Sequence, residues 1–309
     1  MNAAPHNPVL INESIKLLLT NLNGTYLDGT VGFGGHSEAI LNNLLKDGHL
    51  IGTDLDPYAL EYSKKRLSSI QKSYSLHNCN YREYPNLLQS LGIKKLTGIF
   101  IDLGSSSCQI DTKHRGFSYQ KNATLDMRFN QSKGVTAQEY LNTSKEEDIA
   151  TIIKQYGEEK YYKNIAKNIF NAANANKMNT TFDLKLAVSK CIHPRYLTKS
   201  LSRVFQAIRI KINNEIESLK DGLLNSLYFL EKGGRIAVIS FHSIEDKIVK
   251  HFFKRKSLTC ICPPKYPICK CNNEPALKIL TKKAVIPSKS EIERNSRSRS
   301  AKLRVAERI

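Results

Sequence analysis

Residues 28–39 read DGTVGFGGHSEA, directly after the apolar run TYL and directly before the helix-like stretch ILNNLL. A short apolar run followed by glycines and then by a helical pattern is typical of a strand-to-helix turn. Glycines in such a turn let a ligand approach the backbone closely. A dinucleotide, a nucleotide phosphate or S-adenosylmethionine could all be bound there, so the stretch indicates an α/β fold with a cofactor that other residues must identify.

Apolar runs alternate with helical patterns through the first part of the chain. Strands are predicted over residues 25–31, 49–56, 74–80 and 96–104, with helices over 37–46 and 56–70. Three further strands are predicted over 233–241, 277–285 and 300–308. This alternation predicts a parallel sheet with helices on both faces. Five parallel strands closed by a terminal pair are typical of the class I (Rossmann-like) S-adenosylmethionine methyltransferase fold.

The middle of the chain has a different pattern, with a polar loop over 111–130 and then only helices. These helices are predicted over residues 144–157, 158–175 and 182–192. The stretch 202–234 places Phe205, Ile208, Ile212, Ile216, Leu219 and Leu223 on one helical face. We therefore expect a methyltransferase domain in two parts, residues 1–110 and 201–309, interrupted by an inserted all-helical subdomain over 111–200.

The chain of 309 residues has 47 Lys and Arg against 28 Asp and Glu, which gives a net charge of +19. Such a surplus favours a polyanionic partner, of which nucleic acid is the commonest, over a lysine-rich composition without functional meaning. No apolar run approaches the about 20 residues of a membrane span. The N-terminus lacks a signal-peptide pattern. We expect no membrane partner and a cytoplasmic location.

The glycine turn does not match the phosphate-binding motifs. Gly32 and Gly34 fit the first two positions of the dinucleotide fingerprint, but Ser37 occupies the third. A P-loop would need a lysine after the glycines. A nicotinamide-dependent oxidoreductase is therefore the weaker alternative.

Aspartates close three of the predicted strands. They are Asp28, Asp54 and Asp102. Ligands of open α/β sheets bind at the carboxyl ends of the strands, where a carboxylate can accept hydrogen bonds from ribose hydroxyls. Each aspartate alone could be a helix cap, but the three together with the glycines favour a cofactor site.

Several motifs, taken in order, resemble those of one enzyme family. They are DGTVGFGGHS, DLDP, IDLGSSSCQ, RGFSY…LDMR, TFDL, FQAIRIKINNEI, GGRIAVISFHSIED and SRSAKLRVAER. Over nearly its whole length the chain is similar to the bacterial cytosine-N4 methyltransferases of small-subunit ribosomal RNA. The resemblance implies methyl transfer from S-adenosylmethionine to the exocyclic amine of a cytidine in the decoding centre, with the inserted helical subdomain recognising RNA.

The resemblance also implies which residues contact the cofactor. By matching motif these are Gly34, Gly35, His36, Asp54, Tyr81, Asp102 and Gln109. An aromatic face such as that of Tyr81 can pack against adenine. Cys108 stands where the family has proline, which is a departure beside Gln109. Whether the substrate is free rRNA or the 30S subunit stays open, and so does a homodimer.

The chemistry requires help at the amine, because its lone pair is delocalised into the cytosine ring. Groups that accept hydrogen bonds from both amine protons would expose that lone pair. After the fourth strand this chain has Asp102-Leu103-Gly104-Ser105-Ser106-Ser107. We expect catalytic roles for Asp102 and Ser106, the serine hydroxyl acting with backbone carbonyls of the loop. A turn-capping role for Ser106 is the structural alternative.

Two alternative activities remain. Cytosine-C5 methyltransferases use a cysteine nucleophile, and Cys108 follows the fourth strand, although an isolated cysteine is usually a small buried hydrophobe. A non-catalytic RNA-binding protein could also have a degenerate form of this fold. The intact glycines and aspartates argue against it.

Further candidates lie outside the cofactor motifs. Ser243 and Asp246 have the spacing of a capping box, and His242 before them could contact the target nucleotide. Phe117 or Tyr119 could stack on an unstacked base. The basic runs 247–256 and 294–304, with Arg115, Arg128 and Lys133, favour RNA binding.

Four of the seven cysteines are clustered. Cys260, Cys262, Cys269 and Cys271 form two C-x-C pairs. Four thiolates this close could bind zinc. C-x-C is less common than the C-x-x-C knuckle, and a reduced apolar cluster is the alternative. We include no metal ligand in the expected site, and the zinc question stays open.

Overall fold

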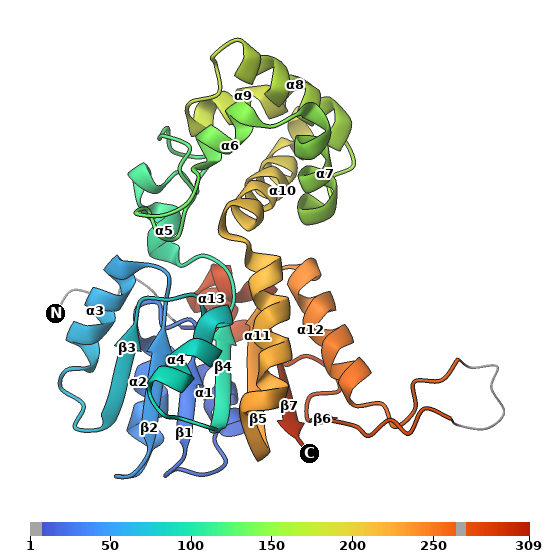
Figure 1. Ribbon diagram of the computed structural model, residues 1–309. Helices are drawn as coiled ribbons and strands as arrows, with labels where there is room; N and C mark the ends of the chain where they lie inside the picture. The colour runs from blue at the N-terminus through green and yellow to red at the C-terminus, as the bar shows by residue number, and fades with distance from the viewer. Residues whose placement is uncertain (1–7, 264–269) are drawn as a thin grey trace. The chain divides into compact units, whose positions relative to one another are not determined.

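The computed structural model describes residues 8–263 and 270–309, except for the side chains of Ser107 and Lys113. The chain divides into two compact units (Figure 1). The sheet unit comprises Met1–Gly104 and Glu217–Ile309, and the helical unit comprises Ser105–Ile216.

The sheet unit contains, among the described residues, a seven-stranded sheet in the order β3-β2-β1-β4-β5-β7-β6. The strands are β1 (Thr25–Asp28), β2 (His49–Thr53), β3 (Ser73–His77), β4 (Leu96–Asp102), β5 (Leu230–Ser240), β6 (Leu277–Ile279) and β7 (Lys302–Arg308). The first five are parallel, and β7 runs antiparallel to both β5 and β6. This order confirms the expected class I methyltransferase fold. The predicted strand 277–285 is shorter than expected, and only an isolated bridge joins Val285 to Leu303.

Helices cover both faces of the sheet, because the central strands are apolar on both sides. On one face lie α1 (Ile11–Leu18), α2 (Gly35–Asn43) and α3 (Pro57–Leu67), packed on Phe100 of β4. On the other lie α4 (Tyr84–Ser90), α11 (Glu215–Phe229) and α12 (Ser243–Lys256), packed on Ile99 and Ile101. The short elements η1 (Tyr81–Glu83), α13 (Lys289–Arg294) and η3 (Ser296–Ser300) complete this unit.

The helical unit has its own hydrophobic core. It consists of α5 (Ser107–Asp111), η2 (Lys113–Arg115), α6 (Ala137–Thr143), α7 (Glu146–Gly157), α8 (Tyr162–Asn174), α9 (Thr181–Ser189) and α10 (Pro194–Asn213). Apolar residues of α7, α8 and α10, such as Ile153, Ile165 and Val204, are fully buried together. None of the helices in the described part of the chain is long and apolar enough to cross a membrane.

The single helix expected over 202–234 is two helices, α10 and α11, and the prediction of one helical face was wrong at their junction. Asn214 breaks the helix with φ +50, a left-handed conformation that asparagine tolerates better than most residues. The apolar spacing continues across Asn214, which is why periodicity did not show the break.

Arg209 joins the beginning of the helical unit to its end. Its Nε and Nη2 donate to the two carboxylate oxygens of Glu215 at 2.8 and 3.0 Å. Its Nη1 donates to Oγ of Ser105 at 3.2 Å. The two ends of this unit are thus held by one guanidinium.

Candidate functional site

Three aspartates lie together at the carboxyl edge of the sheet. β1 pairs with both β2 and β4, and Asp28 is in register with Gly52 and Phe100. Asp102 ends β4, and Asp54 directly follows β2. Because these strands are adjacent and parallel, their last residues meet at one edge, as the sequence predicted.

Asp28 is fully buried and fixes the first turn. One carboxylate oxygen accepts a hydrogen bond from the backbone N–H of Thr30 at 3.1 Å, and the other accepts one from Oγ of Ser37 at 2.6 Å. Burial raises the pKa of Asp28 to about 6, and the nearby charge of Asp54 acts in the same direction. Asp28 therefore ties the strand end to the start of α2.

Asp54 is half-buried and holds the glycine turn from the neighbouring strand. Its Oδ2 accepts the N–H of Gly32 at 2.7 Å, and its Oδ1 accepts that of Asp56 at 2.8 Å. Burial raises the pKa of Asp54 to about 6 as well. Its expected hydrogen bonds to a ribose stay a prediction.

Gly34 and Gly35 are required by the local backbone. Gly34 precedes α2 with φ +79, in the left-handed region where a side chain is strained. A Cβ on Gly35 would lie 2.6 Å from Cγ of Pro8. The turn therefore needs glycine here for conformation and packing, and its contact with a ligand stays a prediction.

Asp102 is the most unusual group of the site. Its backbone N–H donates to Oγ1 of Thr30 at 2.6 Å. Its buried Oδ1 has no hydrogen-bond partner among the described residues. Burial, and secondarily the charges of Asp28 and Glu245, raise the pKa of Asp102 well above its usual value. A buried carboxyl oxygen without a partner is costly in a folded protein, and Oδ1 of Asp102 is therefore a candidate acceptor for a hydrogen bond from a bound ligand.

His36 lies behind Asp102. It is 5% exposed, and its Nε2 lies 2.9 Å from the carbonyl oxygen of Val9, which can only accept a hydrogen bond. Its Nδ1 faces Oδ2 of Asp102 at 3.6 Å, and its ring packs on Phe100. In this structure His36 positions Asp102, and a direct contact between His36 and a cofactor stays a prediction.

Tyr81 begins η1, after β3, at the same edge. A Cβ on Gly222 of α11 would lie 3.0 Å from the Tyr81 ring, and a Cβ on Gly29 would lie 2.9 Å from Cβ of Tyr81. These two glycines give the half-buried tyrosine its place beside the first strand.

The capping box expected from Ser243 and Asp246 is wrong by one residue. The N-cap of α12 is His242, whose Nδ1 accepts the N–H of Glu245, while Oε2 of Glu245 accepts the N–H groups of His242 and Phe241. Asp246 instead pairs with Arg304 and Lys302. Serine is a commoner N-cap than histidine, so the sequence favoured the Ser-x-x-Asp spacing for the capping box in place of the actual His-x-x-Glu spacing.

Glu245 and Thr30 are site residues that the sequence analysis did not single out. Glu245 is 2% exposed and adds to the negative charge around Asp102. An acidic residue at the third position of the helix after β5 was the available signal.

Ser106 and Gln109 belong to the helical unit, where they form a capping box. Oγ of Ser106 accepts the N–H of Gln109 at 3.2 Å, and Oε1 of Gln109 accepts the N–H of Ser106 at 3.0 Å. The capping role foreseen as the alternative for Ser106 is therefore present. The catalytic role of Ser106 and the cofactor contact of Gln109 stay predictions.

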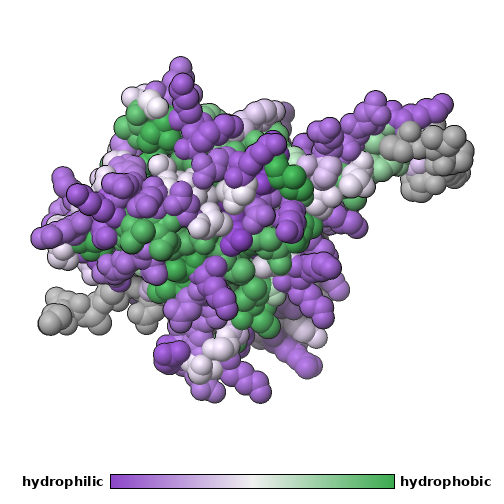
Figure 2. Space-filling view, turned by 90° about the horizontal axis from the view of Figure 1, so that it is seen from below, coloured by the Kyte–Doolittle hydropathy of each residue, from purple (hydrophilic) through white to green (hydrophobic). Residues whose placement is uncertain are grey.

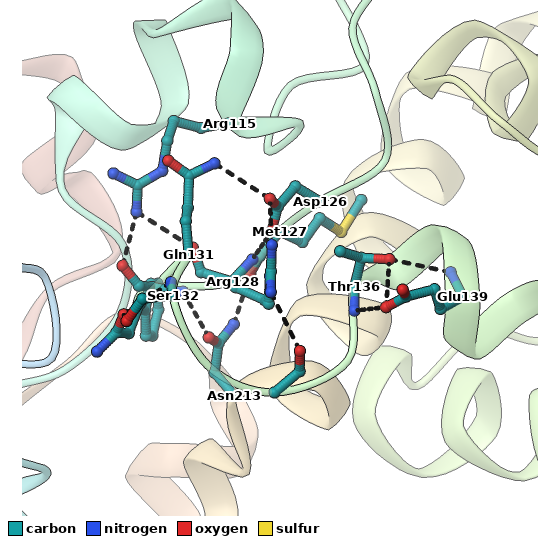
Figure 3. Close-up of polar contacts among 12 residues, drawn as sticks. Arg115, Asp126, Met127, Arg128, Gln131, Ser132, Thr136, Glu139 and Asn213 are labelled. Carbon is teal, nitrogen blue, oxygen red and sulfur yellow. Dashed lines mark hydrogen bonds and ion pairs between the residues drawn. The ribbon is translucent and has the colours of Figure 1, made fainter.

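Arg115 and Arg128 hold a loop of the helical unit, so their expected availability for RNA phosphates was wrong (Figure 3). Arg115 is 6% exposed and donates from Nη2 to the carbonyls of Arg128 and Phe129 at 3.1 and 2.8 Å. Arg128 makes a bidentate pair with Asp126 at 2.8 and 3.0 Å. Asn213 of α10 holds the same loop by accepting from Phe129 N–H and donating to the carbonyl of Met127. Only Lys133, of the three, is exposed.

Phe117 and Tyr119 are likewise packed within the helical unit rather than presented to a base. Phe117 is 8% exposed and stacks on Phe129 with ring centroids 5.7 Å apart. Tyr119 meets Phe205 edge-on, and its hydroxyl lies 3.1 Å from Oγ of Ser202.

The charge of the sheet edge determines what it can bind. Asp28, Asp54, Asp102 and Glu245 are carboxylates on neighbouring elements, and each of the three aspartates has a raised pKa. A diphosphate would be repelled by such a group, whereas a cationic ligand would relieve its mutual repulsion. The edge therefore suits a cation that also carries hydrogen-bond donors.

Comparison with known sequences identifies the family of this chain. Residues 3–309 match the MraW methylase family. The chain belongs to this family. Among its relatives, the ribosomal RNA small subunit methyltransferase H of Caldicellulosiruptor bescii is 45% identical over 305 residues, covering 98% of this chain and 99% of the relative. The enzyme of the same name from Clostridium botulinum is 44% identical over 306 residues, covering 98% and 99%. As a member of the MraW methylase family the chain is a methyltransferase, and the oxidoreductase alternative is not supported.

Proposed function

We propose that this chain transfers a methyl group from S-adenosylmethionine to the N4 amine of a cytidine in the decoding region of small-subunit rRNA. The observation that carries the proposal is the full-length membership of the MraW methylase family, together with a carboxylate-lined sheet edge that suits a cationic donor. Its relatives are named for action on small-subunit rRNA. A ribosomal substrate supports a cytoplasmic location for the enzyme.

The sheet unit supplies the donor site. S-adenosylmethionine carries a sulfonium and an ammonium group, and when bound it supplies the electrophilic methyl. Asp54 accepts hydrogen bonds from the ribose, Tyr81 packs against adenine, and the glycine turn with Asp28 lines the methionine side. Oδ1 of Asp102 is buried without a partner among the described residues. It accepts a hydrogen bond from the bound methyl donor or from the target cytidine.

The target amine is oriented by groups that follow β4. Asp102 and the hydroxyl of Ser106 accept hydrogen bonds from the amine protons, which directs the nitrogen lone pair toward the methyl. The N4 lone pair forms a bond to the methyl carbon as the methyl–sulfur bond breaks in line, the neutral thioether leaves, and one of the amine protons is released. Rate therefore depends mainly on positioning. Oγ of Ser106 accepts one hydrogen bond in the capping box and has a second lone pair for this purpose.

RNA binding relies on exposed cations. In the described part of the chain, exposed basic side chains include Lys133, Lys250, Lys254, Arg255, Arg294 and Arg299. Phosphate contacts of this kind give salt-dependent affinity without sequence specificity.

The decisive experiment is methyl transfer from labelled S-adenosylmethionine to 30S subunits and to protein-free small-subunit rRNA, both from cells lacking this enzyme. We expect N4-methylcytidine after nuclease digestion and chromatography against standards. Appearance of 5-methylcytidine, lost in Cys108→Ser, would instead support the C5 alternative. No transfer to either substrate would refute the proposal.

A further inference from the structure

Residues 257–263 and 270–276, which lie between α12 and β6 in the sequence, extend away from the sheet (Figure 1). The base of this segment is closed by two hydrogen bonds, from Ala276 N–H to the carbonyl of Lys256 at 2.8 Å and from Nδ2 of Asn273 to the carbonyl of Leu258 at 2.6 Å. Residues 257–263 and 270–276, the described part of this segment, contain no helix or strand and no buried residue. Figure 2 shows hydrophilic and hydrophobic residues mixed along this projection on that face.

Three cysteine sulfurs converge in this segment. The Sγ atoms of Cys260, Cys262 and Cys271 all lie within 4.8 Å of one another. The Sγ atoms of Cys260 and Cys271 are 3.9 Å apart. Zn–S bonds of about 2.3 Å in a tetrahedron require sulfurs about 3.8 Å apart. A disulfide would require about 2.05 Å. The observed distance therefore fits ligands around one metal ion.

The backbone donates a hydrogen bond to each of these sulfurs. Ile261 N–H donates to Sγ of Cys271, Cys262 N–H to that of Cys260, and Lys270 N–H to that of Cys262, each at 3.4 Å. A thiol is a weak acceptor, whereas a metal-bound thiolate carries negative charge that N–H groups stabilise. These backbone N–H groups would thus stabilise the thiolate form of each of the three cysteines.

The alternative of a reduced apolar cluster does not fit the exposure of the segment. Cys260 is exposed, and the neighbouring apolar residues Leu258 and Ile261 are 38% and 54% exposed. An apolar cluster stabilises only by removing surface from water, which these side chains do not achieve. Ordering such a segment costs conformational entropy that a metal ion can offset.

We propose that Cys260, Cys262 and Cys271 bind a structural zinc ion that holds residues 257–263 against residues 270–276. Thiolate ligands favour zinc among the common cellular divalent ions, and structural zinc is four-coordinate. Cys269, the remaining cysteine of the motif, lies outside the described residues, and the proposal rests on the other three. The site is in the sheet unit and involves none of the residues assigned to the donor or the target amine.

Elemental analysis of the full chain tests the site. Protein from zinc-supplemented cells, desalted under reducing conditions, should contain about one zinc per chain. The triple variant C260S/C262S/C271S should contain about tenfold less. Cys191→Ser is the matched control, since Cys191 is a half-buried cysteine of the helical unit, and it should keep its zinc. Cobalt substitution should give the absorption of tetrahedral thiolate-bound cobalt in the wild type and the control only.

A second readout follows the order of the segment. Lys270 is exposed, and removal of the metal by a chelator should accelerate tryptic cleavage after it while far-UV circular dichroism stays unchanged. Zinc content far below one per chain after anaerobic reconstitution would overturn the proposal. Zinc retained in full by the triple variant would also overturn it. Both results are independent of methyl transfer, so they leave the proposed function untouched.

Discussion

Nδ1 of His36 lies 3.6 Å from Oδ2 of Asp102, in the interior of the sheet edge. Because the Val9 carbonyl accepts from the other ring nitrogen, Nδ1 bears no proton in the neutral ring. A proton that lies between Nδ1 of His36 and Oδ2 of Asp102 must therefore belong either to the carboxyl group of Asp102 or to a doubly protonated imidazole ring. The raised pKa of Asp102 favours the carboxyl group when no ligand is bound.

Asp102→Asn should weaken binding of S-adenosylmethionine by about 10- to 100-fold, since a hydrogen bond to a charged group contributes roughly 1.5–3 kcal/mol. Titration calorimetry measures this directly. Asp47→Asn, at an exposed position of the same unit, is the control and should bind normally. Equal affinities of the two variants would contradict the assigned role of Asp102.

His36→Phe should preserve the packing on Phe100 but remove both nitrogens. The Val9 carbonyl and the Asp102 carboxyl then lose their partner, so we expect the free energy of unfolding to fall by about 1–3 kcal/mol. Donor affinity should fall less than in Asp102→Asn, because His36 acts through Asp102. Chemical denaturation and calorimetry on the same sample separate the two effects.

Binding of the donor should weaken as the pH falls through about 6. Asp28 and Asp54 both have a pKa of about 6 in the folded chain, and a cationic ligand needs them ionised. For Asp28 and Asp54, affinity should fall on the order of tenfold per pH unit below pH 5.5 for each group that must ionise. A flat profile between pH 5 and 8 would exclude this electrostatic role.

The same pKa has the opposite consequence for the ligand-free fold. For Asp28, the folded value of about 6 exceeds the ordinary 3.8, so the folded state binds more protons between these pH values. The free energy of unfolding therefore falls as the pH rises from about 4 to 6, by up to about 3 kcal/mol. Asp28→Asn should be more stable than the wild type at pH 7.5, and the difference should vanish near pH 4. Urea denaturation at both pH values checks it.

Ser106→Asn separates capping from catalysis. Asparagine is an N-cap as good as serine, so the stability of the helical unit should change by less than about 0.5 kcal/mol. If the hydroxyl orients the target amine, kcat should fall roughly tenfold while KM for the donor stays the same. Ser106→Ala removes both functions and should also cost about 1 kcal/mol of stability. Unchanged kcat in Ser106→Asn would leave Ser106 with capping alone.

Arg128→Ala and Lys133→Ala should have different effects although the two residues lie in one loop. Arg128 makes a bidentate pair with Asp126, and losing it leaves that buried carboxylate without its main partner. We expect about 1–3 kcal/mol loss of stability. Lys133 is exposed, so its removal should leave thermal unfolding unchanged but reduce the salt dependence of RNA binding. Filter binding at several salt concentrations measures the second effect.

The sequence was sufficient for the sheet and for the residues that line its edge. Alternating apolar runs identified the strands, and aspartates at three strand ends identified the cluster of carboxyl groups at the sheet edge, because both signals are local. Buried charges were predicted less well. Arg115 and Arg128 looked like RNA-binding residues by composition, but their partners, the carbonyls of the loop and Asp126, are set by the tertiary fold.

The break between two consecutive helices was also not predicted from the sequence. The apolar spacing from Phe205 to Leu223 continues through Asn214, and only the left-handed backbone there separates α10 from α11. The cap of α12 was misplaced for a related reason, since histidine is a rarer N-cap than serine.

The guanidinium of Arg209, which bridges Ser105 and Glu215, has a consequence for the order of folding. Strands β4 and β5 pair side by side although the whole helical unit separates them in the chain. Closing so long a loop from the unfolded state costs about 2 kcal/mol more than closing a short one. If the helical unit folds first, its two ends already lie close, and the connection left to close between the strands is much shorter, consisting mainly of α11. Variants that loosen this unit should therefore slow completion of the sheet, with an effect on refolding rate larger than their effect on the unfolding rate.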